Sequence, residues 1–175
     1  MKLICYLSNG YPTLEESAKL AEYYVQGGCD VIEIDLPSRN PYLESDYIAN
    51  RMATALRACD DYDKYMENIL EIRRRLPNTK LFILSYENTV KEIGIEKFAD
   101  FCNSNDMKDI IFVGLENEDI KNKLIEKGLK VSCYVQSMML PEEVESAKAS
   151  NGLFNIRQKP QPKKSTLHFL LLQTV

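Results

Sequence analysis

The feature that most constrains the fold is an alternation of short apolar runs with longer amphipathic stretches along most of the chain. The apolar runs have the length of buried strands, and the stretches between them have the spacing of helices. Strands that recur after helical crossovers form βαβ units and therefore a parallel sheet. The expected strands are residues 3–7, 31–36, 80–85, 109–113, 129–135 and 153–156.

Six such units predict an α/β fold, and two architectures satisfy them: an open doubly wound sheet, or most of a barrel. The periodicity alone does not choose between the two. No G-x-G-x-x-G or G-x-x-x-x-G-K-S/T motif follows any expected strand. The sequence therefore disfavours a dinucleotide site and a P-loop nucleotide site.

The expected helices have recognisable ends. Thr13 and Glu16 have the spacing of a capping box, in which the threonine side chain accepts a backbone N–H and the glutamate reaches back. The helix that follows is predicted to end at Gly27, since glycine tolerates the left-handed conformation. The other expected helices are residues 44–57, 60–76, 95–102, 120–127 and 141–149.

Composition narrows the class of protein. The chain has 175 residues, 45% hydrophobic and 27% charged, which is an ordinary balance for one globular domain. Its net charge of −4 and its pI near 5.2 disfavour nonspecific attraction to nucleic acid or to anionic lipid. No stretch reaches the length of a membrane span or of a signal-peptide core. We therefore expect neither nucleic acid nor a membrane as a partner.

The five cysteines are dispersed, contain no C-x-x-C pair, and lie far along the chain from the only histidine, His168. This pattern argues against a zinc site and against a disulfide framework. We expect reduced thiols in a cytoplasmic protein, with Cys5 and Cys133 used for core packing.

The strongest physical signal for function is a carboxylate in the second expected strand. Side chains alternate between the faces of a strand, so Val31, Glu33 and Asp35 share one face. A glutamate inside a strand buried on both sides is costly unless it is paired or functional. Near the carboxyl end of a barrel strand it would point into the active-site mouth. The structural alternatives are an exposed sheet edge or a lysine partner.

Other polar residues carry weaker signals. Taken alone, Glu44 is expected to be a solvated carboxylate in the first turn of a helix, where the helix dipole favours it. Tyr86 and Asn88 lie just past the third expected strand, where a polar group is either a ligand contact or a helix cap; for Asn88 we expect the cap. The loop Ser38-Arg-Asn40 has groups that can bind an anion.

The end of the chain changes character. Residues 158–165 are polar and broken by prolines, and residues 167–173 form a short apolar run. This change separates residues 1–157, an α/β domain that is a partial barrel if the barrel alternative holds, from an atypical tail over residues 158–175. Open strand edges are an aggregation liability. Our hypothesis is that the C-terminus is truncated or frameshifted and that residues 167–172 cover one open edge.

Several of these residues form motifs that resemble the tryptophan synthase alpha chain family. The opening of that family is similar to Tyr6-Leu-Ser-Asn-Gly-Tyr-Pro-Thr13 followed by Gly28-Cys-Asp-Val-Ile-Glu-Ile-Asp-Leu-Pro37. The family's third-strand element, L-x-Y-x-N, is similar to Ile83-Leu-Ser-Tyr-Glu-Asn88, and the later part shares mainly the helix–strand cadence. The resemblance implies a (β/α)8 TIM-barrel type of fold, here truncated to about six βα units.

The resemblance also implies a reaction: retro-aldol cleavage of indole-3-glycerol phosphate to indole and glyceraldehyde 3-phosphate, without metal or cofactor. Glu33 falls on the family's catalytic glutamate, which protonates the indole carbon that carries the glycerol chain. Glu44 falls on the family's second carboxylate, an aspartate that holds the indole N–H. Tyr6 falls on a phenylalanine of the indole pocket, and Tyr86 and Asn88 are expected to contact substrate. A tryptophan synthase beta chain is the partner that the resemblance implies.

The departures from the family pattern define the alternatives. Glu44 is one methylene longer than aspartate, Asp35 replaces a small residue, and Gly114 and Glu116 replace an aspartate and a proline. The family's phosphate site comes mostly from the loops and the helix N-terminus that follow strands seven and eight, and the sequence shows no pattern for either strand. The alternatives are an inactive barrel relative or fragment that acts as a binding or assembly subunit, and a related phosphate-sugar enzyme with another substrate.

Overall fold

Six parallel strands form the sheet, and each pairs with the strand that follows it in the sequence. The computed structural model describes residues 2–114, 118–136, 141–152 and 155–157. The strand order β1-β2-β3-β4-β5-β6 contains no reversal. The strands are β1 (Ile4–Leu7), β2 (Val31–Leu36), β3 (Lys80–Tyr86), β4 (Asp109–Val113), β5 (Lys130–Gln136) and β6 (Asn155–Arg157).

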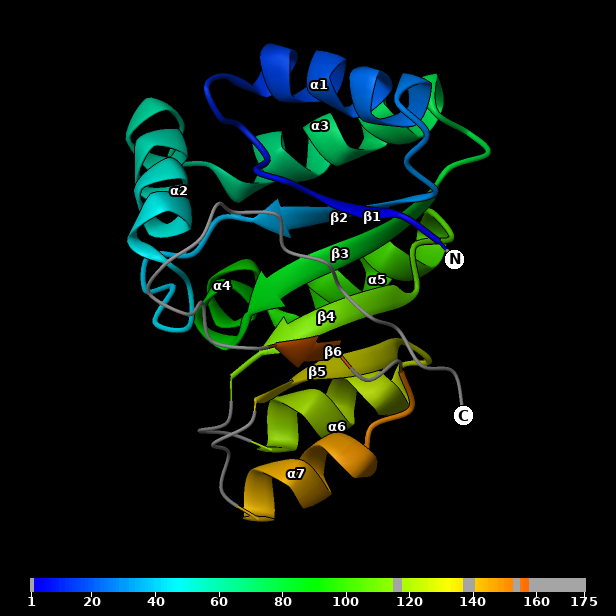
Figure 1. Ribbon diagram of the computed structural model, residues 1–175. Helices are drawn as coiled ribbons and strands as arrows, with labels where there is room; N and C mark the ends of the chain where they lie inside the picture. The colour runs from blue at the N-terminus through cyan, green and yellow to red at the C-terminus, as the bar shows by residue number, and fades with distance from the viewer. Residues whose placement is uncertain (1, 115–117, 137–140, 153–154, 158–175) are drawn as a thin grey trace, which may run out of the picture.

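This order decides between the two architectures that the sequence allows. A doubly wound sheet reverses its strand order at a switch point, with helices on both faces. A barrel adds every strand on the same side of the one before. The helices stand along the outer side of the strands, with α1 and α3 beside β1 and β2, and α6 and α7 beside β5 (Figure 1). The chain therefore has the (β/α) barrel type of fold over six units, as the resemblance implied.

Seven helices are described. They are α1 (Leu14–Gln26), α2 (Asp46–Ala58), α3 (Tyr62–Arg75), α4 (Glu87–Ile93), α5 (Ile95–Ser104), α6 (Glu118–Glu126) and α7 (Pro141–Lys148). The cap of α1 is confirmed, since the Thr13 hydroxyl accepts the N–H of Glu16 at 3.1 Å. Helix α4 was not expected. It is seven residues long, and Gly94, with φ at 94°, separates it from α5.

The two faces of the sheet bury different clusters. Ile32, Ile34 and Leu36 of β2 face the helices and belong to the larger core. Val31 belongs to a smaller cluster on the inner face, which includes Phe82, Leu84, Tyr86, Ile111 and Val113 from β3 and β4. The alternation predicted for β2 is therefore confirmed, and it places Glu33 and Asp35 on the inner face with Val31.

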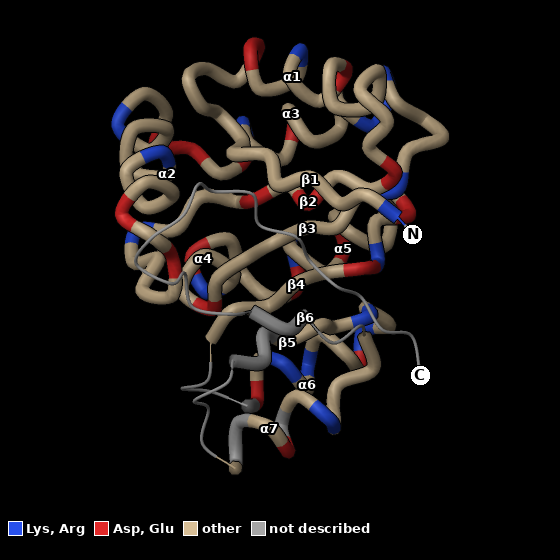
Figure 2. The backbone as a smooth tube through the Cα atoms, in the orientation of Figure 1, with Lys and Arg blue, Asp and Glu red and all other residues tan. Residues whose placement is uncertain are grey.

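The outer helices of the described part carry charged residues of both signs. Acidic and basic residues are interspersed along the outer helices (Figure 2). Among the described residues no helix is both long enough and apolar enough to span a bilayer. Glu116 and the predicted tail, residues 158–175, lie outside the described residues.

Candidate functional site

The candidate site lies on the inner face of the sheet, toward the carboxyl ends of the first strands, where enzymes of this architecture hold their substrates. Glu33 is 2% exposed and Asp35 is 1% exposed. Glu33 is opposite Tyr6 of β1 and opposite Phe82 of β3, so it is flanked by a strand on each side. The structural alternative that places Glu33 at an exposed sheet edge is therefore wrong.

Asp35 is held by two hydrogen bonds. The Tyr6 hydroxyl donates to one carboxylate oxygen at 2.5 Å, and the backbone N–H of Asn9 donates to the other at 2.7 Å. Burial raises the pKa of Asp35 to about 7; the two hydrogen bonds oppose the rise, and the charges of Glu44 and Glu33 add to it. Burial and the neighbouring Asp35 also hold the pKa of the Tyr6 hydroxyl well above its ordinary value. The inner face thus carries several mutually repelling acids.

Glu44 joins this group from the loop between β2 and α2. Because Ser45 caps α2, which begins at Asp46, Glu44 lies outside the helix. Its carboxylate accepts the hydroxyl of Tyr86 at 3.0 Å, and the Tyr86 ring meets the edge of Tyr42 with centroids 6.0 Å apart. The expectation of a solvated first-turn carboxylate is therefore wrong, because a tyrosine from β3 holds the side chain half-buried.

Four of the five residues that the sequence singles out are thus brought together: Tyr6, Glu33, Glu44 and Tyr86. Tyr86 is the last residue of β3, and its side chain is fully buried. The charges of Glu33 and Glu44 both act on Asp35, and that of Glu44 acts on Tyr6 as well, so the acids lie close enough to influence each other.

Asn88 has a different place. It lies in the first turn of α4, whose N-cap is Tyr86, and the cap has no side-chain hydrogen bond. The expectation that Asn88 caps the helix is therefore wrong. Its side-chain oxygen accepts the hydroxyl of Ser38 at 3.0 Å, and the Ser38 oxygen accepts the N–H of Asn40 at 3.0 Å. Asn88 fastens the β2–α2 loop to α4.

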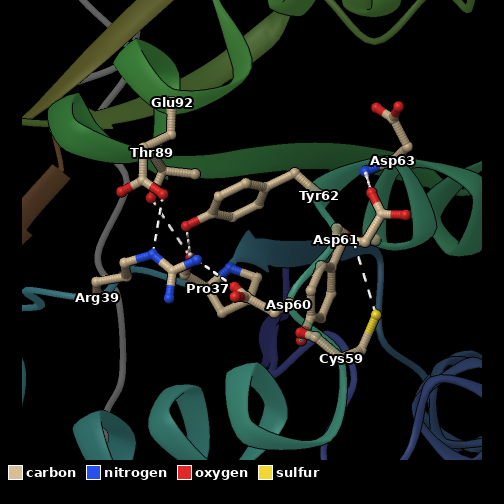
Figure 3. Close-up of polar contacts among 10 residues, drawn as sticks. Pro37, Arg39, Cys59, Asp60, Asp61, Tyr62, Asp63, Thr89 and Glu92 are labelled. Atoms are coloured by element: carbon tan, nitrogen blue, oxygen red, sulfur yellow. Dashed lines mark hydrogen bonds and ion pairs between the residues drawn. The ribbon is translucent and has the colours of Figure 1, made fainter.

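Arg39 anchors the same loop on its outer side (Figure 3). Its guanidinium forms an ion pair with Asp60, and its Nε donates to Glu92 at 2.9 Å. The Pro37 carbonyl accepts the hydroxyl of Tyr62 at 3.1 Å. The arginine that could have bound an anion is therefore engaged by two carboxylates of the chain itself.

A network of buried side-chain amides, formed by Asn9 and Asn68, holds the β1–α1 turn beside the site. The Asn9 side chain donates to the Tyr65 carbonyl at 3.1 Å and accepts from Asn68 at 2.8 Å. Gly10 has φ at 80°, and a Cβ there would lie 2.6 Å from the Tyr65 ring. The sequence signalled only a turn at this place. It gave no sign that Asn9 would present its backbone N–H to Asp35.

Two further observations concern metal binding and the groove beside the site. Among the described residues no group of three or more His, Cys, Asp or Glu side chains could hold a metal ion. A groove of about 410 Å³ lies between the β2–α2 loop and α2, outside the acidic group. It is lined by Ser38, Arg39, Pro41, Ala49, Asn50, Ala53 and Leu56.

Comparison with known proteins identifies relatives of the chain. The family model "Tryptophan synthase alpha chain" matches residues 1–141. The chain is 29% identical over 130 residues to the tryptophan synthase alpha chain of Methanosarcina barkeri, covering 73% of this chain and 48% of that protein. It is also 29% identical over 117 residues to that of Zymomonas mobilis, covering 67% and 43%. The chain thus spans about half the length of the curated relatives it matches.

Solved structures show the same fold. A ligand-free tryptophan synthase from M. tuberculosis superposes with a TM-score of 0.77 at 24% identity, covering 90% of this chain and 64% of that one. The tryptophan synthase subunit alpha of Legionella pneumophila superposes with a TM-score of 0.79 at 22% identity, covering 90% and 62%. At these identities the likeness supports the architecture of the described units.

Proposed function

The chain belongs to the tryptophan synthase alpha chain family, and on this basis we propose that it is an alpha-type lyase. The reaction is the retro-aldol cleavage of indole-3-glycerol phosphate to indole and glyceraldehyde 3-phosphate. The observation that supports it is the burial of Glu33 on the inner face of β2, because the sequence resemblance assigns to this residue the role of the family's catalytic glutamate.

Glu33 is the proposed general acid. Protonation of the indole carbon that carries the glycerol chain weakens the bond to be broken, and a carboxyl group can deliver that proton only while it is protonated. Burial disfavours the charged form of a carboxyl group, which matches this requirement. The residues opposite Glu33 in the strand register are both aromatic, Tyr6 of β1 and Phe82 of β3.

Glu44 is the proposed second acid, which holds the indole N–H and takes part in proton removal. The Tyr86 hydroxyl, 3.0 Å away, gives it a defined direction although it lies on a loop. Compared with aspartate, glutamate moves the carboxylate by about 1.5 Å, roughly one C–C bond. A misplacement of about 1 Å can cost on the order of a hundredfold in rate, so turnover slower than in the rest of the family is expected.

Three further residues are proposed to help bind the substrate, two by contact and one indirectly. Tyr6 and Tyr86 would contact it from β1 and β3. Asn88 would act through the β2–α2 loop, because its side-chain oxygen is bonded to Ser38. The loop also carries Glu44, so a change at Asn88 is expected to alter the position of the second acid.

The decisive experiment measures indole release from indole-3-glycerol phosphate, with and without a tryptophan synthase beta chain. Wild-type protein should release indole, and Glu33→Gln should abolish the release with the circular dichroism spectrum unchanged. Glu67→Gln, the same change on the exposed face of α3, is the matched control and should keep wild-type activity. No indole above background from folded wild-type protein, with or without the beta chain, would refute the proposal.

A second pair of variants tests Glu44. Glu44→Asp should raise turnover if the site is a drifted form of the family's, and Tyr86→Phe should lower it by releasing the Glu44 side chain. If neither variant changes the rate while Glu33→Gln still abolishes it, Glu44 is not the second acid.

One observation favours a second function, an inactive relative that serves as a binding or assembly subunit. Asp35 and the Tyr6 hydroxyl bring polar groups to the pocket where the family holds an indole ring. A chain of this kind would form a complex with a beta chain, measured by light scattering, and would release no indole. Absence of both complex and turnover would exclude it.

A further inference from the structure

A basic side chain of α2, Arg51, lies between two aromatic rings. The carbon at the centre of its guanidinium is 5.0 Å from the centroid of the Tyr11 ring and 4.3 Å from that of the Tyr47 ring. Its terminal nitrogen Nη2 donates to the Tyr47 hydroxyl. Contacts with two rings restrict a side chain that otherwise has many rotamers. Arg51 therefore holds its positive charge in a defined place before any ligand binds.

This charge lies beside the candidate site. Tyr11 belongs to the β1–α1 turn, in which Asn9 donates its backbone N–H to Asp35 at 2.7 Å. Arg51 is in the second turn of α2, a helix that begins two residues after Glu44. Figure 1 shows α2 at the end of the sheet toward which the arrows of β2 and β3 point. Arg51 and the acids thus belong to the same end of the sheet.

Among the residues that the structure describes, no carboxylate pairs with Arg51. Two other basic side chains at this end are paired: Arg39 with two carboxylates, and Lys91 with Glu87. The Nε–H of Arg51 is buried and has no acceptor in the described part of the chain. A buried N–H normally has a partner, because leaving it without one is costly. An oxygen of a bound ligand would supply the acceptor.

The charge of the proposed substrate makes such a cation necessary. A phosphate ester carries about −1.5 to −2 charges near pH 7. Glu33, Asp35 and Glu44 lie at the same end of the sheet, and the negative charge of any that ionise opposes the approach of a phosphate. A guanidinium offsets this repulsion, and its planar fork donates two parallel hydrogen bonds to a phosphate group.

We propose that Arg51 is a phosphate-binding residue, which donates from Nε and a terminal nitrogen to the phosphate group of the substrate. Tyr11 and Tyr47 are its positioning residues. The inference rests on the proposed function for the class of substrate. It deepens that function by placing the phosphate beside the β1–α1 turn and α2, whereas the family holds it in the loops after strands seven and eight.

The test uses the full chain and sn-glycerol 3-phosphate, a three-carbon phosphate ester without the indole ring, so that no cleavage interferes. NMR of ¹⁵N-labelled protein follows the Nε–H signal of Arg51, which is the one that Arg51→Lys removes. The signal should shift with glycerol 3-phosphate until it saturates, and it should stay in place with uncharged glycerol. A signal that glycerol 3-phosphate does not move would overturn the inference.

Affinities of variants show whether Arg51 carries the binding. By calorimetry, Arg51→Gln should bind glycerol 3-phosphate at least about tenfold more weakly than wild type, because hydrogen bonds between charged groups are the strong ones. Arg57→Gln is the matched control. It removes an arginine from the exposed face of the same helix, where the side chain donates to Thr54, and should bind as wild type does. Equal affinities in the two variants would refute the assignment.

Tyr47→Leu keeps the test open if Arg51→Gln fails to fold. Tyr47 is 65% exposed, so its replacement leaves the core intact. Loss of the ring and hydroxyl releases the guanidinium, and the affinity for glycerol 3-phosphate should fall about two- to fivefold. Tyr23→Leu, at a residue of α1 that is 64% exposed, should leave it unchanged. In that case, equal affinities in the two tyrosine variants would overturn the inference.

The outcomes for the inference and for the proposed function can be told apart. Phosphate-ester binding that depends on Arg51, in a protein that releases no indole, supports the inference and refutes the lyase. Indole release with equal affinities in Arg51→Gln and Arg57→Gln supports the lyase and refutes the inference. Where both hold, Arg51→Gln should raise KM for indole-3-glycerol phosphate at least about tenfold with little change in kcat, because the phosphate is held equally before and during the reaction.

Discussion

Asp35 should make the stability of the protein fall as the pH rises, and the size of the effect follows from its pKa. The pKa is raised from 3.8 to about 7 in the folded chain, chiefly by burial. At this position the folded chain therefore binds more protons than the unfolded chain between those two pH values. The free energy of unfolding decreases with pH wherever the folded state binds more protons.

The stability that protonated Asp35 contributes is thus fully present below about pH 4 and is lost as the pH rises through about 7. The pKa difference corresponds to about 4 kcal/mol in total. Roughly 2 to 3 kcal/mol of this is lost between pH 5 and pH 8. Asparagine has the same shape and does not titrate. Relative to the wild type, the free energy of unfolding of Asp35→Asn should therefore rise by roughly 2 to 3 kcal/mol between pH 5 and pH 8.

Urea denaturation of both proteins at pH 5 and at pH 8 measures the effect. The difference between variant and wild type should grow in favour of Asp35→Asn as the pH rises. Asp109→Asn, the same replacement at a partly exposed carboxylate, supplies the baseline for a change of charge on the sheet. A difference that is equal at the two pH values, within about 0.5 kcal/mol, would show that Asp35 is not the buried acid described here.

Three further predictions concern packing and surface charge. Ile34→Ala leaves a cavity at a fully buried position between the sheet and the helices, so it should lower the free energy of unfolding by about 2 to 5 kcal/mol in urea denaturation. The control Leu3→Ala, at a residue that is 44% exposed, should lower it by about 0.5 kcal/mol or less. Gly114→Ala should cost about 1 to 3 kcal/mol, because φ is 152° and the new Cβ would lie 2.5 Å from that of Glu87. A double-mutant cycle with Glu87→Gly should recover part of that loss, and strict additivity would refute the clash. Arg39→Met should change stability by less than about 1 kcal/mol, since its ion pairs are exposed; a larger loss would mean that the β2–α2 loop depends on them.

The sequence predicts the elements of this fold well because their signals are local. Apolar period and strand length place all six strands to within about two residues, and the alternation in β2 places Glu33 and Asp35 on the inner face. The order of the strands is not a local property. The sequential pairing of strands that lie far apart in the chain is what distinguishes a barrel from a doubly wound sheet, and in the sequence only the family motifs point to it.

What the sequence did not predict depends on contacts between distant segments. The first-turn expectation for Glu44 failed because its partner, Tyr86, lies 42 residues away. Helix α4 was missed because seven residues hold too few apolar positions to show a period. The hydrogen bond between Tyr6 and Asp35 joins residues 29 apart and depends on the pairing of β1 with β2.

Asp35 on β2 departs from the pattern of burial that the rest of the chain follows, in which apolar side chains are buried and charged ones are exposed. The caps, the strand periods and the separation of the apolar faces agree with one another, and such agreement is what makes a sequence specify one fold. Asp35 is the exception. Keeping its carboxylate ionised near neutral pH lowers the free energy of unfolding by about 4 kcal/mol. The whole free energy of unfolding of a globular domain is typically about 5 to 15 kcal/mol. A packing role does not explain this cost, because asparagine would fill the same volume and keep an acceptor for Asn9.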